Sequence, residues 1–224
     1  MRGFKLKRIR WLILSFFTVL QSGNAVATEN KVEIFTASTR GDSYTVCVSI
    51  AIENSEASRT SFAEKMQAIY DHHNLRLTYE DGGKFWQLPH VTLVMFEKVK
   101  REDIEAFEGI FDQLSGIILA FSPEFFNFFG RGDQLVAMPH QSFVTEAKKL
   151  NAQIIDWVNK NIDSTQYKVC RNTLNKTFKP HLALNTSVPH KNFQGRVQRI
   201  LGKALQSTTI QLNQVSITAT NEWS

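Results

Sequence analysis

Two stretches of the chain share one pattern of hydrophobic and polar positions. Residues 88–93 read LPHVTL and residues 179–184 read KPHLAL. Because successive side chains of a strand point to opposite faces, each stretch predicts a β-strand with its histidine on one face and its aliphatic residues on the other. We therefore expect the two histidines, His90 and His181, to meet across one site.

The similarity continues beyond the two stretches. A helical periodicity begins at Arg101, and another begins at Asn192, at the same interval after the second histidine. Each helix is followed by a β-rich run. The sequence therefore predicts a degenerate internal duplication, with the order strand, helix, strand in both halves.

Alternating or helical apolar spacing predicts the remaining elements. Further strands are expected over residues 44–52, 86–96, 134–138 and 167–170, and helices over 56–73, 101–116, 143–159 and from 192 onward. The β-rich run 117–129 is interrupted at Ser122-Pro123, which suits a bulge or an edge strand, and the run 208–220 changes phase, which predicts a bulge. The summed pattern is α+β, with helices packed on largely antiparallel sheets.

The N-terminus has the three parts of a secretory signal. Five basic residues precede an apolar run over 11–20, and Ala25-Val26-Ala27 forms a small-x-small site. The apolar run is short for a membrane span. We expect cleavage after Ala27, export to a periplasm or the medium, and no membrane attachment afterwards; an uncleaved anchor is the alternative. Residues 28–42 are then a flexible leader, and 43–224 a single domain.

Removal of the signal changes the charge and narrows the ligand classes. The full chain has 26 Lys and Arg against 21 Asp and Glu, and the five basic residues of the signal account for the difference. The formal charge of the mature chain is then zero, so binding to long nucleic acid is not favoured. A small or short anionic ligand fits better. Cys47 and Cys170 are expected either to form a disulfide or to be two buried thiols.

The two histidine strands suit acid–base chemistry on a phosphodiester. With an unperturbed pKa near 6.5, one imidazole can be neutral while the other is protonated, as general-base and general-acid catalysis requires. Thr92 shares a face with His90 and can donate a hydrogen bond to a phosphate oxygen. We expect no cofactor and no metal, and the sequence has no HExxH or Cys-rich zinc spacing.

These residues resemble the 2H phosphoesterases, the family related to 2'-5' RNA ligases and cyclic phosphodiesterases. The family signature is two copies of His-x-Thr/Ser-x, with x usually hydrophobic. Residues 90–93 (HVTL) match it fully, whereas 181–184 (HLAL) lack the hydroxyl at Ala183. The resemblance implies a two-lobed, pseudo-symmetric α+β fold, with antiparallel sheets flanking a central groove and helices outside. It also implies hydrolysis of 2',3'-cyclic phosphates or 2'-5' linked nucleotides.

The resemblance assigns catalysis to His90 and His181 and phosphate binding to Thr92. In the family the second hydroxyl helps to hold the phosphate. Asn185 lies two positions beyond Ala183, on the same face if the strand is straight, and we expect its amide to substitute. Further candidates for contacts to the phosphate or base are Phe129, Arg131, Tyr167 and Lys179.

Other functions stay open at this point. One is a nucleotide- or phosphate-binding module that has lost efficient catalysis, as the missing hydroxyl at Ala183 would indicate. Another is a phosphoesterase with a non-nucleotide substrate. A histidine in an apolar strand is also often a hydrogen-bonded core residue. The expected partner is a nucleotide or a short RNA-like phosphodiester, and the protein is expected to be a monomer.

Overall fold

The computed structural model describes residues 30–36, 42–52, 56–75, 89–129, 134–174, 176–187, 191–205 and 207–221. Within these ranges the side chains of 56–63, 129, 134, 185–187 and 191–193 are not described. The expected signal, 1–27, lies outside the described residues. Among the described residues, no helix has the length and apolar character needed to cross a membrane.

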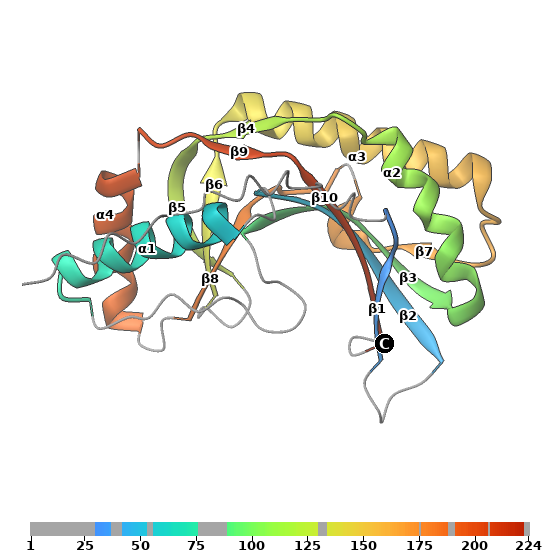
Figure 1. Ribbon diagram of the computed structural model, residues 1–224, viewed down its shortest axis with the longest axis horizontal. Coiled ribbons are helices and arrows are strands. Elements are labelled where there is room, and N and C mark those ends of the chain that lie inside the picture. Colours follow the sequence, from blue (N-terminus) through green and yellow to red (C-terminus); the bar gives the residue numbers. More distant parts are fainter. Residues whose placement is uncertain are drawn as a thin grey trace, which may run out of the picture.

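The strands form three sheets (Figure 1). The five-stranded sheet has the order β1 (Glu33–Phe35), β10 (Gln214–Thr220), β2 (Ser43–Ala51), β3 (His90–Lys100) and β7 (Lys168–Val169). The three-stranded sheet has the order β5 (Pro123–Phe129), β6 (Gln134–Pro139) and β8 (Leu182–Ser187), and β4 (Leu119–Phe121) pairs with β9 (Ile210–Leu212). Among the described strands every pairing is antiparallel except that of β1 with β10. The expected α+β class is confirmed.

The helices lie beside the two larger sheets. Figure 1 shows α2 and α3 along the five-stranded sheet, and α1 and α4 beside the three-stranded sheet. Their bounds are α1 Glu56–His72, α2 Ile110–Gln113, α3 Gln141–Asn161 and α4 Lys191–Leu205. The expected helix from Arg101 is mostly a 3-10 helix, η1 (Arg101–Gly109), which continues into α2. The buried residues Ile104, Phe107 and Ile110 recur every third position, which is the period of a 3-10 helix.

The elements form two equivalent sets, which confirms the predicted duplication. The first set, in chain order, is β2, α1, β3, η1 with α2, β4 and β5. The second set, in the same order, is β6, α3, β8, α4, β9 and β10. β2 pairs with β3 and β10, just as β6 pairs with β8 and β5. The interval that separates His90 from His181 also separates Leu119 from Ile210, the first residues of β4 and β9. The two histidine strands therefore occupy the same place in their respective halves.

The pairing of β4 with β9 shows how the halves are related. Leu119 pairs with Leu212 and Phe121 pairs with Ile210. In the duplication, Ile210 corresponds to Leu119 and Leu212 corresponds to Phe121. Leu119 therefore pairs with the counterpart of Phe121, and Phe121 pairs with the counterpart of Leu119, as in a two-fold symmetric contact. An approximate two-fold axis therefore passes through the centre of this pair and relates β3 to β8.

The phase change in the run 208–220 is not a bulge within one strand. Asn213 separates β9 from β10, and these two strands lie in different sheets. The apolar phase changes because the chain leaves the pair of β4 and β9 and joins the five-stranded sheet. We call the five-stranded sheet with its helices the first lobe, and the three-stranded sheet with its helices the second lobe. Ser122 makes the same transition between β4 and β5, and Pro123 begins an edge strand, as the sequence predicts.

Part of the expected leader is ordered, which the polar composition of 28–42 does not suggest. Residues 33–35 form β1 and pair in parallel with β10. Val32 is buried, and its backbone N–H donates to Glu108 Oε1 at 3.4 Å. Three residues are too few to show a periodicity, so the strand depends on the neighbouring sheet edge. Residues 28–29 and 37–41 of this segment lie outside the described residues.

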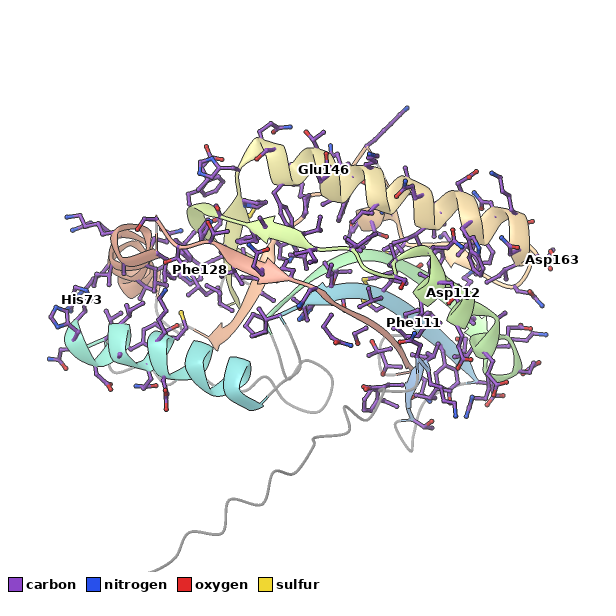
Figure 2. The ribbon with its side chains drawn as sticks, turned by 45° about the horizontal axis from the view of Figure 1, so that its top comes forward. His73, Phe111, Asp112, Phe128, Glu146 and Asp163 are labelled. Carbon is purple, nitrogen blue, oxygen red and sulfur yellow. The ribbon has the colours of Figure 1, made fainter. Side chains whose placement is uncertain are left out.

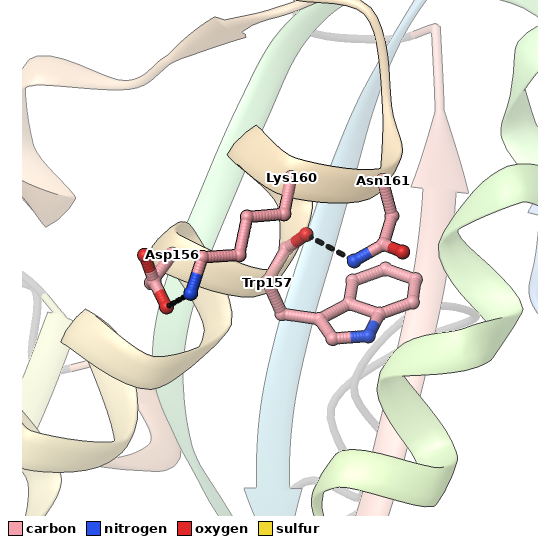
Figure 3. Close-up of polar contacts among 4 residues, drawn as sticks. All are labelled: Asp156, Trp157, Lys160 and Asn161. Atoms are coloured by element: carbon pink, nitrogen blue, oxygen red, sulfur yellow. Dashed lines mark hydrogen bonds and ion pairs between the residues drawn. The ribbon is translucent and has the colours of Figure 1, made fainter.

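The helix α3 packs against η1 through Trp157. Figure 3 shows the indole ring pointing from α3 toward the neighbouring helix. A Cβ added to Gly109 would lie only 2.5 Å from Trp157 Cζ2, so a glycine is needed at this contact. On the exposed side of the same turn, Lys160 Nζ lies 2.7 Å from Asp156 Oδ2, and Asn161 Nδ2 donates to Trp157 O at 2.7 Å (Figure 3).

Candidate active site

The two histidine strands lie beside each other in the middle of the molecule. β3 and β8 belong to different sheets but contact each other, and Figure 1 shows their first residues between the two lobes. Val91 and Leu182 are completely buried in one core cluster. Because side chains alternate along a strand, His90 and His181 lie on the side of their strands that faces away from this core.

The ring of His181 is oriented by a backbone carbonyl. His181 Nδ1 lies 3.0 Å from Lys179 O. A carbonyl oxygen only accepts hydrogen bonds, so Nδ1 carries the proton in the neutral ring and Nε2 carries the lone pair. Nε2 is therefore the atom of this side chain that can accept a proton.

Burial lowers the pKa of His181 below its usual 6.5, and the hydrogen bond to Lys179 O opposes the effect only in part. The charged form of an imidazole loses hydration when the ring is buried, so the neutral form is favoured. His181 is therefore neutral at pH 7, as a general base must be before it acts.

His90 begins β3 and is buried, with 7% of its surface exposed. Its backbone is held by the pairing of β3 with β2, in which His90 lies opposite Ala51. This differs from His181, which is partly exposed and lies one residue before β8. The two-fold relation is therefore approximate at the site, and the two histidines have different surroundings.

Thr92 lies in a row of hydroxyl groups across three strands. Thr92 on β3 pairs with Ser49 on β2, which pairs with Ser216 on β10. Ser49 is buried and its hydroxyl donates to Ser216 O at 3.4 Å, whereas Thr92 and Ser216 are partly exposed. We call this set of three residues the hydroxyl row.

A buried thiol lies next to Thr92. Cys47 Sγ donates to Thr92 Oγ1 at 3.9 Å. Burial raises the pKa of Cys47 to about 12, so the thiol stays protonated at ordinary pH and remains a weak donor. Since this contact uses a lone pair of the Thr92 oxygen, the hydroxyl proton of Thr92 can point to a phosphate. Cys170 is also buried, and both cysteines are free, so the disulfide alternative is wrong.

Asn151 holds the outer edge of β3, and sequence reasoning missed it. This residue is completely buried on α3, where Nδ2 donates to Leu93 O at 2.7 Å and to Thr173 O at 2.8 Å. Thr173 Oγ1 accepts a hydrogen bond from Met95 N at 3.1 Å. The edge of β3 just beyond Thr92 is therefore fixed by side chains, in place of a neighbouring strand. The sequence does contain a signal for this role, because Asn151 is a polar residue between the inward-facing positions Leu150 and Ile154 of the expected helix.

The corresponding row of the second lobe is mostly apolar. Ala183 on β8 pairs with Val136 on β6, which pairs with Asn127 on β5. Val136 and Ala183 are buried, and Asn127 is exposed with its Oδ1 accepting from Phe128 N at 2.8 Å. The missing hydroxyl of the second motif is therefore not replaced from β6.

The substitution of Asn185 for that hydroxyl assumes a straight strand, and β8 is not straight there. Ala183 pairs with Val136 and Ser187 pairs with Gln134, so β8 covers four positions over a stretch in which its partner β6 covers two. This irregularity removes the simple alternation that would put Asn185 on the face of Ala183. The backbone of Asn185 belongs to β8, and its side chain lies outside the description.

The other candidate contacts are placed as follows. Tyr167 packs edge-on against Phe96, with ring centroids 5.5 Å apart, and its hydroxyl donates to Asn159 Oδ1 at 2.7 Å. Tyr167 is therefore a core residue of the first lobe, where burial raises its pKa. Lys179 is exposed and orients His181 through its backbone carbonyl. Phe129 ends β5, but its side chain lies outside the description, and Arg131 lies outside the described residues.

The remaining described histidines do not join the site. His72 ends α1 and His73 follows it, with ring centroids 4.8 Å apart, and Figure 2 shows His73 at the outer end of that helix. His140 is exposed at the start of α3. Within the described part of the chain, no group of three or more His, Cys, Asp or Glu side chains is arranged to hold a metal ion.

Comparisons with known proteins return structural similarity alone. No family model matches the chain, and no curated protein matches it. The structure of Kluyveromyces marxianus Usb1 is similar with a TM-score of 0.42 and 10% identity, covering 82% of this chain and 95% of that chain. The same protein with uridine monophosphate gives a TM-score of 0.41 and 12% identity, with coverages of 82% and 95%.

A further solved structure, described as a phosphoesterase, is similar with a TM-score of 0.38 and 12% identity. It covers 78% of this chain and 94% of that chain.

Proposed function

We infer that this protein is a metal-independent phosphodiesterase that hydrolyses 2',3'-cyclic phosphates or 2'-5' linked nucleotides. One observation carries the proposal. The internal duplication gives each lobe a strand with a histidine on its face away from the core, and these two strands contact each other around an approximate two-fold axis. A substrate phosphate between them has an imidazole on either side.

Such an arrangement suits in-line displacement at phosphorus. The attacking and leaving oxygens lie on opposite sides of the phosphorus, so the base and the acid must also lie on opposite sides. His181 is the base in this scheme, because its Nδ1–H donates to Lys179 O and its Nε2 carries the lone pair. His90 is then the acid.

In the hydrolysis of a 2',3'-cyclic phosphate, His181 Nε2 takes a proton from water while the water oxygen forms a bond to phosphorus. The bond from phosphorus to one ribose oxygen breaks, and that oxygen takes a proton from His90. Thr92 donates a hydrogen bond to a non-bridging oxygen, where negative charge grows in the transition state. The product is a nucleoside monophosphate, and proton exchange with water restores both histidines.

A binding module without efficient catalysis is the second candidate, and one observation favours it. The row of Ala183, Val136 and Asn127 offers no hydroxyl where the first lobe has three. A phosphate held from one lobe alone loses donors on the other side, which lowers transition-state stabilisation more than it lowers ground-state binding.

Turnover separates the two candidates. The full chain is incubated with 2',3'-cyclic nucleotides and with a 2'-5' linked adenylate, in the presence of EDTA, and the release of nucleoside monophosphate is measured by chromatography. Our proposal predicts catalytic turnover that EDTA does not reduce. A folded protein that binds these compounds but does not convert them contradicts the proposal and favours the binding module.

Export is part of the same proposal and rests on the sequence of residues 1–27. It predicts that protein recovered from outside the cytoplasm of the producing cell begins at Thr28. The mass of the intact protein measures this, and recovery of the uncleaved chain in the cytoplasm contradicts it.

A further inference from the structure

The two faces that border the proposed site are equivalent in the duplication but differ in chemistry. The first lobe presents the hydroxyl row, whose members are Thr92, Ser49 and Ser216. The second lobe presents Ala183, Val136 and Asn127 at the matching level. Hydroxyl groups attract phosphate oxygens, whereas an apolar face does not. Ala183 and Val136 are buried, so on this side a substrate meets no counterpart of the partly exposed hydroxyls of Thr92 and Ser216.

The apolar face of the second lobe continues to an exposed aromatic ring. Phe125 on β5 pairs with Met138 on β6, and these two residues lie two positions from Asn127 and Val136 along their strands. Since side chains two positions apart share a face, Phe125 and Met138 lie on the face of Ala183. Phe125 is 49% exposed, whereas Phe126, on the opposite face, is 5% exposed.

The position of Phe125 matches the reach of one nucleotide. His181 directly precedes Leu182, the first residue of β8, which pairs with Ala137 on β6, and Ala137 pairs with Phe126 on β5. Phe125, the residue before Phe126, therefore lies near the end of the sheet at which His181 enters β8. One strand, β6, separates β8 from β5. With neighbouring strands about 4.8 Å apart, Phe125 lies roughly 10 Å across the sheet from the strand of His181. A phosphate beside His181 can therefore place its attached base near this ring.

We propose that Phe125, with Met138 beside it, forms a platform on which the base of a nucleotide stacks. The phosphate then lies between the histidines against the hydroxyl row, and the base extends over the three-stranded sheet toward β5. Every base has a flat π-face, so a phenylalanine binds purines and pyrimidines without a strict sequence requirement. This inference rests on the proposed function for the position of the phosphate and adds the direction in which the substrate lies.

Equilibrium binding to the full chain tests the platform without turnover. Dissociation constants are measured by calorimetry for adenosine 2'-monophosphate and for ribose 5-phosphate, which has no base. Phe125→Ala should weaken binding of adenosine 2'-monophosphate by about 5- to 150-fold, the range expected for the loss of one base stacked on an aromatic side chain. Binding of ribose 5-phosphate should not change, and Phe125→Trp should restore adenosine 2'-monophosphate binding.

Ile118→Ala is the matched control, because Ile118 is a large apolar residue that is 65% exposed and lies outside the sheet face described above. It should leave both dissociation constants unchanged. The platform is refuted if Phe125→Ala binds adenosine 2'-monophosphate as tightly as the parent, if both ligands weaken equally, or if the parent binds neither. A parent that binds adenosine 2'-monophosphate through Phe125 but does not hydrolyse the cyclic nucleotide keeps the platform and refutes the proposed hydrolase.

Discussion

At the scale of single residues, the site depends on the different surroundings of two histidines that the sequence makes equivalent. His181 is oriented by Lys179 O and kept neutral by burial, and His90 is buried at the start of β3. The motif alone predicts both histidines and the hydroxyl of Thr92. It does not predict Asn151, because the contacts that hold β3 come from residues far apart in the sequence.

The hydroxyl of Thr92 can be tested by a substitution that keeps its shape. Thr92→Val should lower kcat for a 2',3'-cyclic nucleotide about 100-fold, as expected for the loss of one donor to a developing negative charge. Thr92→Ser should keep most of the activity, because it keeps the hydroxyl. Steady-state kinetics measures both, and circular dichroism checks folding. Equal activity of Thr92→Val and the parent would show that this hydroxyl does not act on the substrate.

The pKa of His181 predicts the acid side of the pH profile. A base must be unprotonated, so kcat/KM should fall only below pH 6.5, since burial lowers the pKa from that value. The same shift affects stability. Below pH 6.5 the unfolded chain binds the proton more readily than the folded protein does, so the free energy of unfolding should decrease as pH falls and stay level above pH 6.5. A midpoint above 6.5 in kcat/KM would contradict His181 as the base.

At the scale of elements, periodicity predicts most of the fold but not its irregular parts. The alternation in 44–52 and the helical spacing in 143–159 match β2 and α3 closely. β1 and the step from β9 to β10 were not anticipated, because both depend on which sheet a short segment joins. Within η1 the buried residues are Ile104 and Phe107, and a spacing of three occurs in both 3-10 and α-helices, so the sequence did not distinguish the two.

The contact between α3 and η1 gives a stability prediction. Gly109→Ala places a methyl group where Trp157 lies, 2.5 Å away, and should lower the free energy of unfolding by about 1–3 kcal/mol. Gly202→Ala is the control, because it lies in α4 with nothing within 4 Å and should be neutral or slightly stabilising. Urea denaturation measures both. A Gly109→Ala protein as stable as Gly202→Ala would show that the indole ring moves away at no cost.

At the scale of the whole molecule, the duplication explains why the two motifs meet. Each lobe completes its sheet with a strand from the other half: β10 follows the second histidine strand but pairs with β2, and β5 follows the first but pairs with β6. The repeated order of elements was visible in the sequence. The exchange of strands was not, since it is a property of pairing between distant segments.

A double-mutant cycle on the two histidines tests whether they act together in catalysis. The parent, His90→Ala, His181→Ala and the double variant are compared on a 2',3'-cyclic nucleotide with EDTA present. If the histidines act as one acid–base pair, each single substitution should lower kcat at least about 100-fold, and the double variant should be little worse than either single one. Retention of activity in either folded single variant, or losses that simply multiply in the double variant, would contradict the account.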